Sequence, residues 1–93
     1  MRVRFTRPAQ ADLKQTYAYV SRENPVQASR LVAGLVERAR AIGDSPFFGR
    51  ETDEQNVRVV IAPKLRHLIF YAVKDGEVHI THIRHTSRRP WID

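Results

Sequence analysis

Cations, a histidine and a tryptophan gather near the carboxy-terminal end of the chain. The residues concerned are Arg84, His85, Arg88, Arg89 and Trp91. Tryptophan and arginine are the residues most enriched at binding hot spots. A histidine beside arginines can also act as an acid, a base or a phosphate clamp in RNA cleavage. The run therefore predicts a contact surface for an acidic or macromolecular partner, and a solvated basic tail is the simpler alternative.

A second basic group flanks the middle of the chain and consists of Arg50, Arg58, Lys64, Arg66 and His67. Strand alternation places Arg58 on the face opposite its valine neighbours. These cations predict either a recognition surface or an ordinary solvated sheet face, because charged side chains are mostly exposed whatever their role.

Three histidines, His79, His82 and His85, have spacings that suggest a metal site. In a regular strand, residues three apart point to opposite faces, so His82 should face away from the other two. The chain has no cysteine to complete a zinc site. We therefore predict polar-face histidines, no metal and no cofactor.

Composition limits the class of protein. The chain has 93 residues, which is room for one domain spanning 1–93, and 42% apolar residues, which is ordinary for a globular protein. Lysine and arginine outnumber the acids 16 to 10, for a net charge of +6. That field attracts nucleic acid or acidic proteins. The charged start Met1-Arg2-Val3-Arg4 and the lack of a long apolar run predict a cytoplasmic protein without a membrane segment.

Two helices are predicted in the first half, after a short strand at 3–5. Thr6 and Pro8 are typical of a helix start and introduce a helix over 9–21. Asn24-Pro25 introduces a second helix, which ends near Gly43 and has one apolar stripe. The short turn between them predicts an antiparallel helical hairpin.

Three strands are predicted in the second half, at 57–62, 68–73 and 78–84, with Asp75-Gly76 as a tight hairpin turn. The preceding loop carries Phe47-Phe48, which we expect to plug the edge of the core. The fold class is therefore α+β, in the order β-α-α-β-β-β, with the helical hairpin packed on one face of a small, mostly antiparallel sheet. The second helix should bury its stripe on the sheet, through the contacts of Leu31, Leu35 and Ile42 with Val59, Leu68 and Phe70.

The order of elements and four local motifs resemble the RelE/ParE superfamily of bacterial toxins, and its ParE-like branch in particular. The motifs are Ala11-Asp12-Leu13, Asn24-Pro25, Pro46-x-x-Gly49-Arg50, and the pair formed by residues 66–71 with residues 83–91. The likeness covers nearly the whole chain.

This resemblance implies the toxin of a type II toxin–antitoxin system, neutralised by a cognate acidic antitoxin. ParE-like members are associated with inhibition of DNA gyrase, and RelE-like members cleave messenger RNA on the ribosome. We assign target binding to the cluster at 84–91 named above. Antitoxin binding is assigned to Tyr19, Arg50, Arg58 and Arg66. If the chain is instead an mRNA endonuclease, its catalytic residues would be Arg58, Arg66, His85 and Arg88.

A third hypothesis is a small nucleic-acid-binding module without toxicity. Such a module should shift duplex DNA by itself with a steep salt dependence, because each phosphate contact releases a counterion. A toxin of this superfamily is expected not to bind duplex DNA alone.

Overall fold

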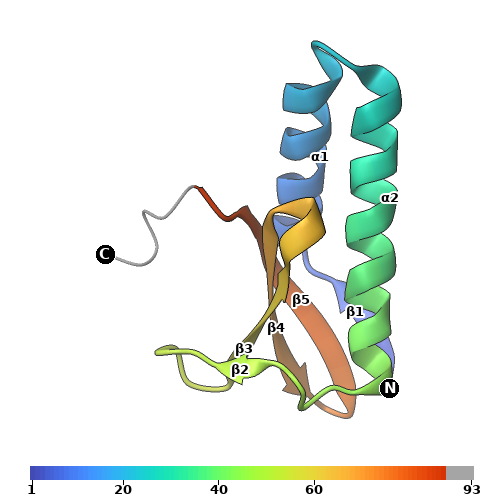
Figure 1. Ribbon diagram of the computed structural model, residues 1–93. Coiled ribbons are helices and arrows are strands. Elements are labelled where there is room, and N and C mark those ends of the chain that lie inside the picture. The colour runs from blue at the N-terminus through green and yellow to red at the C-terminus, as the bar shows by residue number, and fades with distance from the viewer. Residues whose placement is uncertain (88–93) are drawn as a thin grey trace.

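The two helices form as predicted because each has a strong start signal. In the computed structural model, which describes residues 1–87, helix α1 spans Arg7–Ser21 and helix α2 spans Pro25–Ala41. The Thr6 hydroxyl accepts the Ala9 N–H at 3.4 Å, and the Asn24 side chain accepts the Gln27 N–H at 3.0 Å. A single 3₁₀ turn, η1 (Ile42–Asp44), follows α2. Figure 1 shows α1 and α2 as an antiparallel hairpin on one side of the sheet.

The sheet has five strands in the order β1-β5-β4-β3-β2. Their bounds are β1 Arg2–Phe5, β2 Arg50–Glu51, β3 Val57–Ala62, β4 His67–Lys74 and β5 Glu77–His85, with a 3₁₀ turn η2 at Pro63–Leu65. Strand β1 runs parallel to β5, and the other pairs are antiparallel. Asp75 and Gly76 both have positive φ, 53° and 72°, as a two-residue type I′ hairpin requires. The predicted α+β class and element order are confirmed, with the short β2 as an addition.

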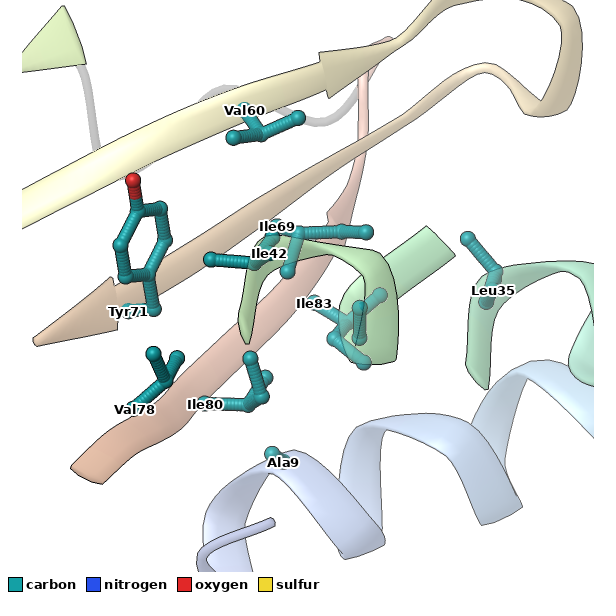
Figure 2. Close-up of a cluster of buried hydrophobic side chains, with 10 residues drawn as sticks. Ala9, Leu35, Ile42, Val60, Ile69, Tyr71, Val78, Ile80 and Ile83 are labelled. Carbon is teal, nitrogen blue, oxygen red and sulfur yellow. The ribbon is translucent and has the colours of Figure 1, made fainter. Parts of the chain in front are cut away.

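The core lies between the helical hairpin and one face of the sheet (Figure 2). Leu35 and Tyr71 are completely buried, and Ala9 brings α1 into the same cluster. The sheet contributes Val60, Ile69, Tyr71, Val78, Ile80 and Ile83. This contact hides the apolar sides of both layers, which neither could hide alone.

The prediction of which face of β3 and β4 packs against the helices is wrong. The helices cover Val60, Ile69 and Tyr71, so Val59, Leu68 and Phe70 lie on the uncovered face. Strands β3 and β4 are apolar on both faces, so alternation alone could not say which set is buried. Arg58 pairs across the strands with the buried Tyr71, and therefore lies on the covered face instead of a solvated one.

The predicted face of His82 is wrong because the register of β5 shifts along the strand. Tyr71 pairs with Ile80 and Phe70 with His82, which leaves Thr81 as the extra residue of a β-bulge. The bulge puts His82 on the same uncovered face as His79, while His85 pairs with His67 on the covered side. In the chain from 1 to 87, no three potential ligand side chains gather as a metal site would need.

The prediction for Phe47 and Phe48 is also wrong. Their exposed fractions are 63% and 80%, so neither side chain plugs the core. The loop between η1 and β2 instead uses its backbone, which hydrogen-bonds to the buried Tyr71 hydroxyl.

Candidate partner-binding groove

A groove of about 920 Å³ lies between the helical hairpin and the end of the sheet. Tyr19 and Arg22 line it from α1, and Arg30 and Leu31 from α2. The opposite wall is formed by η2 and its flanks and by the last part of β5, which contribute Lys64, Leu65, Arg66, His67, Ile83, Arg84 and His85. In Figure 1 the turn end of the hairpin extends past η2 and the end of β5.

The charge of the groove is strongly positive. Its cations are Arg22, Arg30, Lys64, Arg66 and Arg84, and its carboxylate is Asp12. Its apolar lining includes Leu31, Leu65 and Ile83. Cations beside apolar side chains suit an acidic chain segment that carries apolar anchors.

Asp12 is already engaged within the protein. Its Oδ2 accepts the backbone N–H of Ile83 at 2.9 Å and lies 3.2 Å from His82 Nδ1. Its Oδ1 lies 3.6 Å from Arg84 Nη1, and the carboxyl side chain is only 12% exposed. The carboxylate therefore accepts a backbone N–H on the edge of β5 beyond the end of β1. It also holds the Arg84 guanidinium at the groove.

The turn before β4 positions Arg66. Arg66 has left-handed backbone angles, φ 57° and ψ 39°. Its N–H donates to Pro63 O at 3.2 Å, and its carbonyl accepts the Thr86 N–H at 2.9 Å. These two bonds hold a conformation that a non-glycine residue adopts only at a cost. They tie η2 to the end of β5, so Arg66 and His85 line the same groove.

Two histidines meet at the inner end of the groove. The rings of His67 and His85 are 5.1 Å apart at 82°, an edge-to-face contact. His67 is buried, and its Nδ1 lies 2.7 Å from the Leu65 carbonyl, to which it must donate. His85 Nδ1 accepts the Ser87 N–H at 3.1 Å, so its neutral ring carries the hydrogen on Nε2.

The structure brings together some of the predicted site residues and separates others. Tyr19, Arg66, Arg84 and His85 line the groove. Arg50 is exposed on β2, paired with Val59. The predicted residues Arg88, Arg89 and Trp91 lie outside the described part of the chain.

Arg58 is occupied elsewhere. Its Nη1 donates to the carbonyls of Phe47 at 3.1 Å and Gly49 at 2.8 Å, and its guanidinium lies over the Phe47 ring at 5.5 Å. It pairs with Tyr71, four residues along β4 from His67. At about 3.3 Å per residue, roughly 13 Å of strand separates Arg58 from the histidine pair.

Arg22 and Arg30 also line the groove, although neither was predicted as a site residue. They lie on opposite sides of the turn between the helices, and only the antiparallel pairing of α1 and α2 brings them to one wall. A signal was present in the sequence, since both cations flank the Asn24-Pro25 break.

This two-layer α+β domain is a toxin of the RelE/ParE superfamily. Residues 3–90 match the family described as the ParE toxin of the type II toxin-antitoxin system parDE. The chain belongs to this family.

The chain is similar to several characterised proteins along nearly its whole length. It is 33% identical over 84 residues to toxin RelE2 of Caulobacter vibrioides, covering 90% of this chain and 93% of that protein. A structure of the chromosomal ParDE toxin–antitoxin system from P. aeruginosa matches with a TM-score of 0.81 and 27% identity, covering 91% of this chain and 95% of that one. The RelBE2 toxin–antitoxin complex from Mycobacterium tuberculosis shares the fold, with a TM-score of 0.67 and 22% identity over 90% and 95% of the chains.

Across residues 1–87, neither helix has the length and apolar character needed to cross a membrane.

Proposed function

We propose that this toxin acts by binding DNA gyrase and that a cognate acidic antitoxin neutralises it. The observation that carries the proposal is the basic groove, which five cations and several apolar side chains line and in which the carboxylate of Asp12 is already engaged. Such a groove attracts an acidic chain segment and disfavours a basic one.

The antitoxin part of the proposal rests on the groove walls. An acidic segment could place apolar side chains on Leu31 and Leu65 and carboxylates near Arg30 and Arg66. Arginine suits this role because its guanidinium binds a carboxylate with two parallel hydrogen bonds. The ParDE system to which the P. aeruginosa neighbour belongs supports an antitoxin partner for this chain as well.

The target part of the proposal uses the same groove. Arg84 and His85, which we assign to the target, line it together with Tyr19 and Arg66, which we assign to the antitoxin. An antitoxin seated there would cover the target contact, so neutralisation would be competitive. The cluster at 84–91 remains the proposed target contact, and membership of the ParE family is what favours gyrase.

The position of Arg58 supports binding over RNA cleavage. A nuclease must hold its groups within hydrogen-bond reach of one scissile phosphate. Arg58 belongs to the predicted nuclease set, but its guanidinium is bound to loop carbonyls away from Arg66 and His85. A RelE-like mRNA endonuclease is the second candidate, because Arg66 and His85 line one groove and a relative carries the name RelE2.

The test compares purified wild type with Arg84→Gln and with Arg38→Gln as a matched control. Arg38 is an exposed arginine of α2 outside the groove. We expect the wild type to inhibit supercoiling by gyrase and Arg38→Gln to match it. Arg84→Gln should need about tenfold more protein for the same inhibition, which corresponds to a loss of about 1.4 kcal/mol of binding free energy. Site-specific cutting of ribosome-bound mRNA, abolished by Arg66→Ala or His85→Ala, would replace this proposal with the nuclease.

A further inference from the structure

Two exposed phenylalanines stand at the end of the molecule away from the basic groove. Phe47 and Phe48 belong to the loop that joins η1 to β2, and their exposed fractions are 63% and 80%. Neither ring belongs to the hydrophobic core cluster. Exposed aromatic side chains of this size cost free energy in water, so a pair of them held together calls for an explanation.

The loop that carries them is held by groups of the folded domain. The Tyr71 hydroxyl, which is fully buried, donates to Pro46 O at 2.8 Å and accepts the Gly49 N–H at 2.9 Å. A side chain at position 49 would collide with this hydroxyl, which explains the glycine of the Pro46-x-x-Gly49 motif. Arg58, the cross-strand neighbour of Tyr71, donates to the Phe47 and Gly49 carbonyls.

The two rings are therefore presented on a fixed backbone. The Phe48 N–H also bonds to Ser45 O at 3.1 Å, and the Arg58 guanidinium lies over the Phe47 ring. An aromatic anchor whose backbone is ordered before binding loses little conformational entropy on binding. This distinguishes it from an exposed side chain on a loosely held loop.

A hollow of about 390 Å³ adjoins Phe47. Val57 and Val73 give it apolar walls, and Glu51 and Glu54 give it negative charge. Arg58 lines it as well, but its guanidinium is bound to the Phe47 and Gly49 carbonyls. Neither glutamate forms an ion pair with another residue of 1–87. A lysine or arginine side chain of a partner would lay its stem on the valines and its head at the carboxylates, beside Arg58, whose guanidinium is already engaged.

Charge separates this end of the molecule from the rest. Although the chain has a net charge of +6, four of its ten acidic residues are exposed in and around this loop and the β2–β3 turn, namely Asp44, Glu51, Asp53 and Glu54, against the two arginines Arg50 and Arg58. An acidic antitoxin would be repelled here, and a symmetric pairing of two copies would bring like charges together. A basic partner surface is favoured instead.

We propose that Phe47, Phe48 and the adjoining hollow form a second docking surface, which binds a basic surface on the toxin's target. An enzyme that handles DNA presents lysine and arginine to the phosphates, so it offers such a surface. The inference rests on the proposed function in taking the target to be of this kind. It also implies that the antitoxin leaves this end of the toxin uncovered, so this inference replaces the antitoxin contacts first assigned to Arg50 and Arg58.

The test uses Phe48→Ala and the double variant Glu51→Gln/Glu54→Gln, with Val26→Ala as control. Val26 is as exposed as Phe47 but lies in the first turn of α2 and outside both the groove and the hollow. For each variant, thermal unfolding, affinity for the antitoxin, gyrase inhibition and growth arrest on induction are measured. We expect Phe48→Ala and the double variant to weaken gyrase inhibition and growth arrest about tenfold, with antitoxin affinity changed less than about twofold. Val26→Ala should behave as the wild type.

The outcomes separate this inference from the proposed function. Undiminished growth arrest by both variants overturns the inference, as does a parallel loss of antitoxin affinity, which would place the patch in the antitoxin interface. A wild-type dimer that Phe48→Ala converts to a monomer would assign the patch to a second copy. If the wild type arrests growth without inhibiting gyrase, the proposed target is wrong, and the growth-arrest comparison still decides whether the patch contacts the target.

Discussion

At the scale of single residues, Asp12 links the fold to the groove. It receives the Ile83 N–H where β1 no longer covers the edge of β5, and it holds Arg84 with the same carboxylate. Thr6 binds the same edge of β5 three residues earlier, where its hydroxyl donates to the Ile80 carbonyl at 2.8 Å. The Ala11-Asp12-Leu13 motif thus has a structural purpose as well as an effect on groove charge.

Replacing Asp12 should separate these two effects. Asp12→Ala leaves the N–H of the buried Ile83 without its acceptor and should lower the free energy of unfolding by about 1–3 kcal/mol. Asp12→Asn keeps an acceptor oxygen while removing the charge, so it should lose less stability and bind the acidic antitoxin more tightly. Urea unfolding and calorimetric binding measure the two quantities. Equal destabilisation by both variants would show that the hydrogen bond to Ile83 is unimportant.

At the scale of elements, α2 packs on α1 and contributes buried side chains to the core between the two layers. Its completely buried Leu35 packs in the same cluster as Val60, Ile69 and Ile83 of the sheet. The helix also supplies one wall of the groove through Arg30 and Leu31. The orientation of α2 about its own axis therefore determines both which side chains pack in the core and which line the groove.

Leu35→Ala should destabilise the fold by about 2–5 kcal/mol, the usual range for a cavity left by a buried leucine. A matched Val26→Ala, at an exposed position of the same helix, should change stability by less than about 0.5 kcal/mol. Thermal or chemical unfolding measures both. A Leu35→Ala midpoint equal to that of the wild type would be incompatible with the position of α2 described above.

At the scale of the whole molecule, charge is divided between two ends. The groove between the hairpin and the strand ends is basic, while the loop with Phe47 and Phe48 and the β2–β3 turn are acidic. The first suits an acidic segment and the second a basic surface, so a single small domain could meet two partners of opposite charge.

This division predicts how the antitoxin binds. The association rate should fall steeply as salt rises from about 0.05 M to about 0.3 M, since exposed charges are screened within a Debye length. The dissociation rate should change less, because the contacts on Leu31 and Leu65 are apolar. Stopped-flow mixing measures both rates, and Arg30→Gln should reduce the salt dependence of association. A salt-independent association rate would speak against the groove as the antitoxin site.

Much of the fold followed from local sequence alone. Thr6, Asn24 and Pro25 set where the helices begin, and Asp75-Gly76 set the last hairpin, because each acts through hydrogen bonds or backbone angles of its immediate neighbours. The excess of arginine and lysine likewise established the positive charge without reference to the fold.

Only the tertiary structure decided which side chains face the core and which meet at the site. Strands β3 and β4 are apolar on both faces, and the extra residue Thr81 in β5 shifts the alternation, so periodicity could not place Val60 or His82. Phe47 and Phe48 resemble core residues by type, but Tyr71 and Arg58 take the loop backbone and leave both rings outside. Tyr19, Arg30, Arg66 and Arg84 come from four separate parts of the chain. Their meeting in one groove depends on long-range packing, which no local pattern encodes.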